Sequence, residues 1–145
     1  MFRNVLIASD GSELAQKAVA NGLALAKALG AKVTAVTVTD MYPTGPYSPI
    51  PLPSIIEHYE ASAALSAANI LAAVSDAATK LGVPCATVHV KDQRPAEGIL
   101  DAASGNGCDL IVLASHGRRG MERLLLGSQA QEVVTLSTLP VLICR

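Results

Sequence analysis

Five short apolar runs alternate with helix-like segments along this chain, and that alternation constrains the fold more than any other sequence feature. Each run is rich in valine, isoleucine, leucine or alanine and is bounded by glycine, proline, serine or aspartate, as strands usually are. The predicted strands are Val5–Ala8, Lys32–Val38, Ala86–Val90, Leu110–Ala114 and Val141–Cys144. Strands that alternate with helices on this scale predict an α/β fold, with a parallel sheet, helices on both faces and right-handed crossovers.

Four helices are predicted between these strands. The first begins at a serine cap, the second is long and rich in alanine, and a glycine follows the end of each. The third begins at a proline, and the last begins at a capping box with an inner face of small and branched residues. They are Ser12 to about Leu29, Ser54–Leu81, a short helix from Pro95, and a helix after Ser128 with Gln131 in its capping box and Ala130, Val133 and Val134 facing inward. Residues 43–53 hold five of the eight prolines, so we expect a loop over the edge of the sheet that serves as a plain connection or as a lid.

Length and composition bound the remaining possibilities. A chain of 145 residues is long enough for one domain, here residues 1–145. The net charge of −1 argues against a nucleic-acid partner, which requires a basic surface. Neither an uninterrupted membrane-spanning run nor a signal peptide is evident, so we expect a cytoplasmic protein. Cys85, Cys108 and Cys144 lie far apart, which favours reduced thiols over a zinc site or a disulfide framework.

The loop after the fourth predicted strand carries the clearest functional signal. It reads Ser115-His-Gly117-Arg-Arg-Gly120, and Gly127-Ser128 follows at the start of the last helix. Glycine allows a backbone to approach an anion closely, helix-start N–H groups point toward it, and arginines donate charge-assisted hydrogen bonds. In parallel sheets ligands bind at the carboxyl ends of strands, where the strand order reverses. The sequence therefore predicts a phosphate site, although it has neither a Walker loop nor a dinucleotide fingerprint.

The spacing of this motif resembles the nucleotide motif of the universal stress protein family, which runs Gly-x-x-Gly, nine residues, then Gly-Ser or Gly-Thr. Here Ala114 and Gly117 stand in the first part, and nine residues separate Gly117 from Gly127. Asp10-Gly-Ser, Val36-Thr-Val and Pro140-Val-Leu-Ile extend the resemblance over essentially the whole chain. Ala114 departs from the family glycine, and its methyl group is expected to narrow the approach to the ligand. Ala8 stands where some ATP-binding members carry proline.

The resemblance implies a sheet order of 3-2-1-4-5 and a set of nucleotide contacts. Asp10 would face the ribose, the main chain around Val38 would face the adenine, and two segments of glycine, serine and basic residues would enclose the phosphates. The implied site residues are Ala8, Asp10, Val38, Leu113, Ala114, Ser115, His116, Gly117, Arg118, Arg119, Gly127, Ser128 and Gln129. The ligand would be ATP, AMP or ADP, with Mg²⁺ arriving on the phosphates. The family also implies a role in stress response or signalling and a homodimer joined through Val141–Cys144.

Two other functions stay open at this stage. One is a slow ATPase or nucleotidyl transferase, in which Asp10 would hold a metal ion and Arg118 or Arg119 would contact the transferred phosphate. The other is a dimeric interaction protein that no longer binds nucleotide, because Ala114 replaces a motif glycine. Taken singly, each motif residue also has an ordinary reading as a turn, a cap or a solvated side chain. No catalytic residue and no dedicated metal ligand is assigned.

Overall fold

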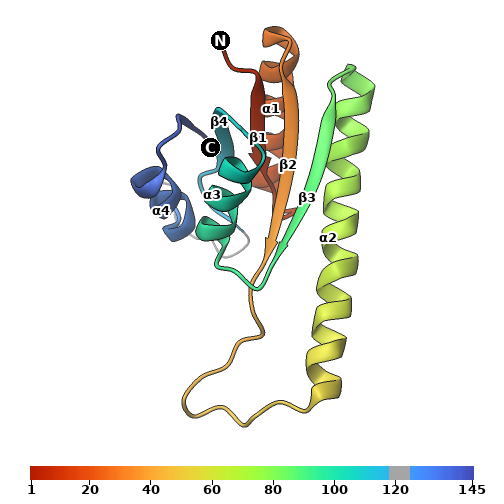
Figure 1. Ribbon diagram of the computed structural model, residues 1–145, viewed down its shortest axis with the longest axis vertical. Helices are drawn as coiled ribbons and strands as arrows, with labels where there is room; N and C mark the ends of the chain where they lie inside the picture. The colour runs from red at the N-terminus through yellow and green to blue at the C-terminus, as the bar shows by residue number, and fades with distance from the viewer. Residues whose placement is uncertain (118–124) are drawn as a thin grey trace.

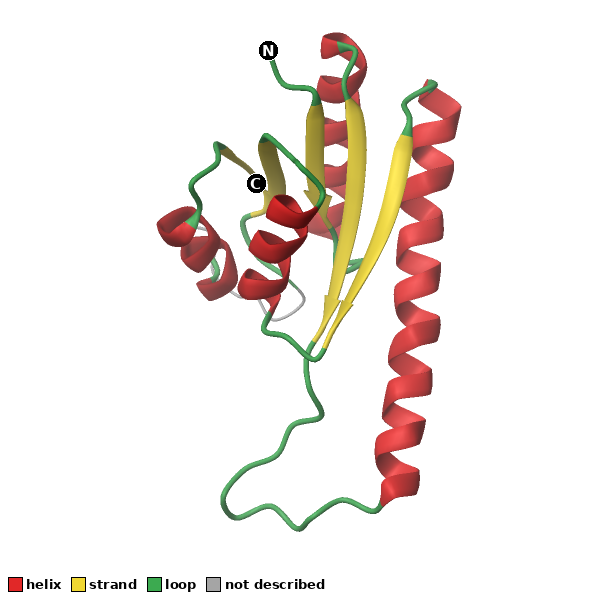
Figure 2. Cartoon of the chain, in the orientation of Figure 1, coloured by secondary structure: helices red, strands yellow, loops and turns green. Residues whose placement is uncertain are grey.

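A computed structural model describes residues 1–117 and 125–145 of the chain. They form one five-stranded parallel sheet in the order β3-β2-β1-β4-β5 (Figures 1 and 2). The strands are β1 (Asn4–Ala8), β2 (Lys32–Thr39), β3 (Cys85–Lys91), β4 (Leu110–Ala114) and β5 (Val141–Cys144). The predicted fold class and strand order are confirmed, and the order reverses between β1 and β4.

Helices cover both faces of the sheet. They are α1 (Glu13–Leu29), α2 (Pro53–Leu81), α3 (Pro95–Gly105) and α4 (Ser128–Leu136). Helices α1 and α2 pack on one face and α3 and α4 on the other, and each face has its own hydrophobic core. Successive side chains of a strand point to opposite faces, so Val5 and Ile7 enter the α1 core while Leu6 enters the α3 core. All five residues of β1 are buried, which explains its continuous apolar run.

The helix ends confirm some of the predicted signals and correct others. Ser12 caps α1 by accepting the Ala15 N–H at 3.2 Å, and Gly30 ends that helix in the left-handed conformation with φ 66°. The capping box predicted at Ser128 is wrong, because the N-cap of α4 is Gly127 and no side chain caps it. Ser128 is already the first helical residue, where its hydroxyl is one position too late to act as the cap.

The inward face of α4 also differs from expectation. The side chains that α4 buries are Ala130 and Val133, whereas Val134 is 45% exposed. One residue along a helix turns the side chain by about 100°, which carries Val134 off the core. Helix α2 buries Ala67, Leu71, Val74 and Ala78.

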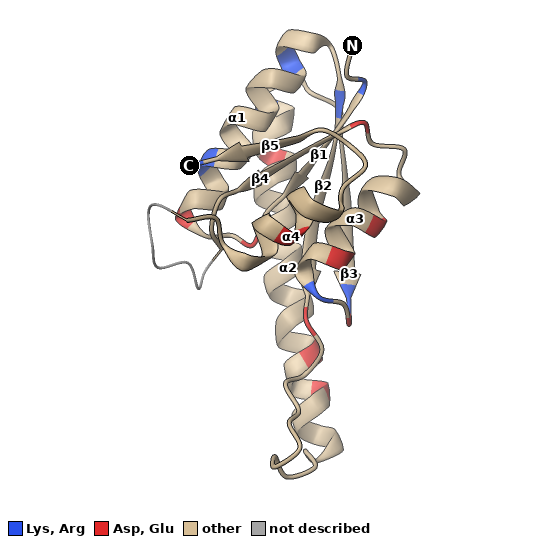
Figure 3. Ribbon diagram, turned by 90° about the vertical axis from the view of Figure 1, so that its left-hand side faces the viewer, with Lys and Arg blue, Asp and Glu red and all other residues tan. Residues whose placement is uncertain are grey.

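The segment between β2 and α2 leaves the sheet altogether. It runs beyond the carboxyl ends of the strands, and α2 carries the chain back, so the first half of α2 projects as an arm past the sheet (Figures 1 and 3). The expected loop over the sheet edge is therefore not what the structure shows. Among the described residues, α2 is the one helix long and apolar enough to cross a bilayer by length and composition, which is weak support for a span because helices packed on a sheet pass the same test.

Candidate functional site

The turns after β1 and β4 meet at the point where the strand order reverses. The two strands are parallel neighbours, with Val5 paired to Leu110 and Ile7 to Val112. A methyl group added at Gly117 would lie 2.8 Å from Asp10 Oδ2, so the loop after β4 lies directly against the acidic side chain after β1. This contact brings together two parts of the predicted site that are more than one hundred residues apart in sequence.

Backbone hydrogen bonds join the same loop to the start of α4. The Gly127 N–H donates to the Ser115 carbonyl oxygen at 2.7 Å, and the Ser115 N–H donates to the Cys144 carbonyl oxygen at 2.8 Å. A methyl group at Gly127 would lie 3.0 Å from that Ser115 oxygen and 3.4 Å from the His116 Cα. Since Gly127 has an ordinary φ of −60°, closeness to the loop is what favours glycine here.

The carboxylate of Asp10 is oriented by its own turn. Its Oδ1 accepts the Ser12 N–H at 2.9 Å, and the Gly11 N–H donates to Ser9 Oγ at 3.2 Å. Gly11 has a φ of 77°, a conformation that glycine adopts without strain. This short turn places an acceptor group at the carboxyl end of β1, immediately before α1.

Three of the remaining predicted residues lie in the sheet. Ala8 ends β1 and is buried, and Leu113 is buried in the core under α3 and α4. The side chain of Val38 also packs toward α3, since a methyl group added at Gly98 would lie 2.8 Å from both of its γ carbons. The side chain of Val38 is therefore occupied in packing between β2 and α3.

The side chain of Ala114 lies on the α1 face of the sheet. Ala114 pairs with Cys144 at the end of β4, and its side chain packs against the core on the α1 face. Leu110 and Val112 share that face because alternate residues of a strand do so. The methyl group that replaces the family glycine thus adds contacts to the α1 core.

The remaining predicted residues belong to the loop after β4 and to the start of α4. His116 is half-buried with Nδ1 3.1 Å from Ser115 Oγ, and Ser128 is exposed at the first turn of α4. Arg118 and Arg119 lie outside the described residues. In residues 1–117 and 125–145, no cluster of three histidine, cysteine or acidic side chains is arranged to hold a metal ion.

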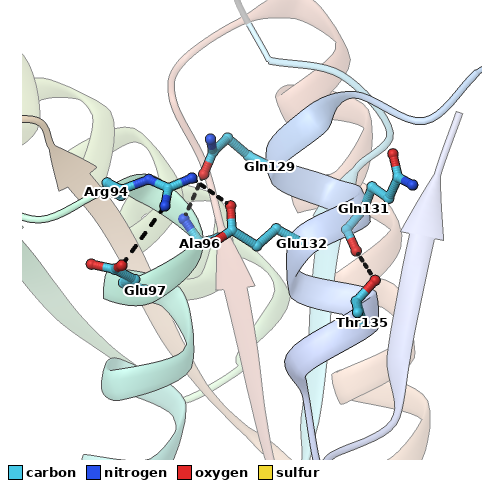
Figure 4. Close-up of polar contacts among 7 residues, drawn as sticks. All are labelled: Arg94, Ala96, Glu97, Gln129, Gln131, Glu132 and Thr135. Carbon is cyan, nitrogen blue, oxygen red and sulfur yellow. Dashed lines mark hydrogen bonds and ion pairs between the residues drawn. The ribbon is translucent and has the colours of Figure 1, made fainter.

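The side chain of Gln129 has a partner that sequence reasoning missed. Its Oε1 accepts the Ala96 N–H at 2.9 Å and so caps α3, whose own N-cap, Arg94, supplies no side-chain cap (Figure 4). Arg94 in turn binds Glu132 Oε2 at 2.8 Å, with Glu97 at 3.9 Å. These contacts fix the start of α4 against the start of α3. An arginine before Pro95 cannot cap the helix well, which was the one sequence signal that an outside acceptor was needed.

A second polar cluster lies at the carboxyl ends of β2 and β3, beside α2. Thr39 Oγ1 and His89 Nε2 are hydrogen-bonded at 2.8 Å, and burial, together with the charge of Lys91, lowers the pKa of His89. A cavity of about 120 Å³ lies here, bordered by these residues, Tyr59 and three acidic side chains. This cavity lies on the face of the sheet that α2 covers. The helix that begins after Gly127, α4, covers the opposite face.

Comparison with known proteins places this geometry in a family. The model of the universal stress protein family matches residues 1–145. A universal stress protein of Thermus aquaticus is 34% identical, and the universal stress protein YxiE of Bacillus subtilis is 32% identical, with all of each chain covered. The solved structure of the universal stress protein UspA from Lactobacillus plantarum has a TM-score of 0.81 at 24% identity, with 99% of this chain and 97% of that chain covered.

Two further solved structures with the same fold contain ligands. A universal stress protein in complex with cAMP has a TM-score of 0.72 at 24% identity, covering 99% and 97% of the two chains. A family member from Arabidopsis thaliana with AMP bound has a TM-score of 0.69 at 16% identity, covering 98% and 90%. The match along the full sequence and the shared fold agree with the convergence of Asp10, Gly117 and Gly127, and the chain belongs to the universal stress protein family.

Proposed function

We propose that this protein binds an adenine nucleotide at the carboxyl ends of β1 and β4. The observation that carries the proposal is the meeting of Asp10, Gly117 and Gly127 at one place, with a methyl at Gly117 only 2.8 Å from the carboxylate and Gly127 bonded to the loop. An acidic acceptor beside close-packed glycines suits a ribose next to a phosphate, because the carboxylate accepts hydroxyl protons and main-chain N–H groups donate to phosphate oxygens. Relatives of this fold solved with cAMP and AMP support the adenine nucleotide class.

Each part of the site has a role in this proposal. Asp10 accepts the ribose hydroxyls, the main chain of Val38 contacts the adenine, and the segment from Leu113 to Arg119 encloses ribose and phosphate. The start of α4 at Gly127 and Ser128 donates to phosphate oxygens through its N–H groups. The side chain of Gln129 holds α4 against α3, so its contribution to the ligand comes from the main chain. ATP with Mg²⁺ held on its phosphates is the proposed form of the ligand.

Calorimetry on paired variants tests the nucleotide site. Asp10→Ala should weaken ATP binding by at least about tenfold, equivalent to about 1.4 kcal/mol, because the ribose loses its acceptor. Asp76→Ala removes the same charge from an exposed position on α2 and should leave the affinity unchanged. Equal ATP affinity for the parent and Asp10→Ala would contradict the proposed site. Turnover of ATP that is lost in Asp10→Ala would instead identify the protein as an ATPase.

We further propose that two copies pair through β5 in a cytoplasmic homodimer that acts in stress response or signalling. β5 is an edge strand, and exposed apolar side chains lie on it and on the neighbouring α4, at Leu142, Val134 and Leu136. A pair of edge strands satisfies the unpaired backbone groups of both. The three cysteines are free thiols, which fits a reducing compartment.

Leu142→Lys tests the dimer. It should reduce the mass measured by light scattering to that of one chain, because a charge would be buried at the strand pair. Leu29→Lys is a matched control, since both leucines are 39% exposed, and it should leave the dimer intact. A mass of one chain for the parent protein at micromolar concentration would rule out the dimer.

A further inference from the structure

The segment between β2 and α2 carries an unusual surface. Residues 43–53, here called the proline segment, contain five prolines, and no charged residue lies between Asp40 and Glu57. Of the thirteen large apolar side chains exposed in the described residues, five belong to residues 41–55. They include Tyr47 at 99% exposure and Ile50 at 94%. Such a concentration of exposed apolar groups in about a tenth of the chain marks an interaction surface.

The end of this segment, from Pro49 to Pro53, favours polyproline II geometry. Pro49, Pro51 and Pro53 alternate with Ile50 and Leu52, so φ is fixed near −65° at every second position. Leu52 itself has φ −64° and ψ 145°, close to the ideal polyproline II values. The turn that comes before Pro49 is closed by one hydrogen bond, from the Ser48 N–H to the Gly45 carbonyl oxygen at 3.0 Å. The proline spacing and the angles of Leu52 therefore indicate an extended ribbon from Pro49 to Leu52.

Both ends of the segment are fastened to the folded domain. The Tyr59 hydroxyl donates to the Asp40 carbonyl oxygen at 3.0 Å, and the Tyr42 ring meets the Tyr59 ring edge to face with centroids 5.3 Å apart. At the other end, Leu52 is the N-cap of α2 and accepts the Ile55 N–H at 2.9 Å. A ribbon held at both ends and stiffened by proline loses little conformational freedom when it is bound.

The charges around the segment narrow the kind of partner. Residues 41–79 contain no lysine or arginine, and Glu57 and Glu60 lie on the first turns of α2 (Figure 3). An anionic lipid surface would require basic residues, so a membrane is not the occupant that this composition fits. A protein groove lined by aromatic rings binds polyproline II ribbons, and a basic rim on that groove would complement the two glutamates.

We propose that the proline segment is a docking site for a partner protein that presents an aromatic-lined, polyproline II-binding groove with a basic rim. Pro49 and Pro51 enter the groove with Ile50 and Leu52, and the rim faces Glu57 and Glu60. The segment projects beyond the carboxyl ends of the strands and joins the arm of α2 (Figure 1).

Binding of the immobilised full chain to purified SH3, WW and EVH1 domains tests this proposal. At least one of these domains should bind saturably, and the double change Pro49→Ala and Pro51→Ala should weaken that binding by about tenfold or more. Pro84→Ala, a change of the same kind outside the segment, should leave it unaltered. Glu57→Gln with Glu60→Gln should weaken binding several-fold and reduce its dependence on salt.

Three outcomes would overturn the docking site. They are no saturable binding by any of the domains at millimolar concentration, equal binding by the parent and the double proline variant, and a loss of ATP affinity in that variant. The last would identify the segment as a lid on the nucleotide site. The docking measurement uses no nucleotide, so its failure would leave the proposed nucleotide site standing.

Discussion

Gly127 is the position where the smallest change should have the largest effect on the site. Its φ and ψ, −60° and 153°, are allowed for any residue, so alanine brings no backbone penalty. The added methyl would lie 3.0 Å from the Ser115 carbonyl oxygen, the acceptor of the Gly127 N–H at 2.7 Å. Both contacts involve backbone, which cannot rotate away, so the loop after β4 must separate from the start of α4.

The expected magnitude follows from those contacts. Overpacking costs about 1–3 kcal/mol, and the lower entropy of the unfolded alanine chain offsets about 0.4–1 kcal/mol, which leaves a destabilisation of about 1–2 kcal/mol. ATP affinity should fall by more than about tenfold, because the two walls of the proposed phosphate site move apart. Gly127→Val adds a branched side chain at the same place and should abolish binding.

Urea unfolding and calorimetry with ATP measure the two effects. Gly105→Ala is the matched control, because an added methyl there meets nothing within 4 Å and the residue ends α3. It should raise the free energy of unfolding by about 0.5–1 kcal/mol and leave ATP affinity unchanged. If Gly127→Ala kept both the stability and the ATP affinity of the parent, the close contact with Ser115 would not be what holds the site together.

Two other predictions concern the surroundings of the site. Gln129→Ala should lower the free energy of unfolding, measured in urea, by about 0.5–2 kcal/mol, because the Ala96 N–H loses its cap. Gln131→Ala, on the exposed side of α4, is the control and should change the free energy of unfolding little. Equal losses in the two variants would contradict the role of that cap. His89 has a lowered pKa in the folded state, so the unfolded chain binds more protons and stability should fall as the pH drops below about 6.5. His89→Gln should remove that part of the decline, and identical pH profiles for parent and variant would refute it.

Much of the fold follows directly from the sequence because its signals are local. Strands such as β1, buried on both faces, show as unbroken apolar runs, and Gly30 and Gly82 end α1 and α2 in the left-handed conformation that glycine favours. Part of the site is predictable for the same reason, since the turn at Asp10 and the glycine motif each have a local pattern. Their approach in space was expected from the rule for parallel sheets and from the family resemblance.

Other features depend on contacts that no local pattern records. Helix α4 starts one residue earlier than the serine signal indicated. A helix of nine residues has too few apolar positions to show which face packs inward, so the prediction that Val134 faces the core is wrong. Gln129 was expected near the phosphates because of its place in the motif, yet its side chain caps a helix 33 residues away in sequence. The side-chain direction of Ala114 depends on the register of β4 between β1 and β5.

The nucleotide site is tested most directly by what the protein carries from the cell. Freshly purified protein is denatured by heat, and the released small molecules are identified by mass. We predict an adenine nucleotide from the parent protein and little or none from Asp10→Ala. Parent protein that releases no nucleotide, and that then shows no heat of binding with ATP and Mg²⁺ up to millimolar concentration, would contradict the central claim.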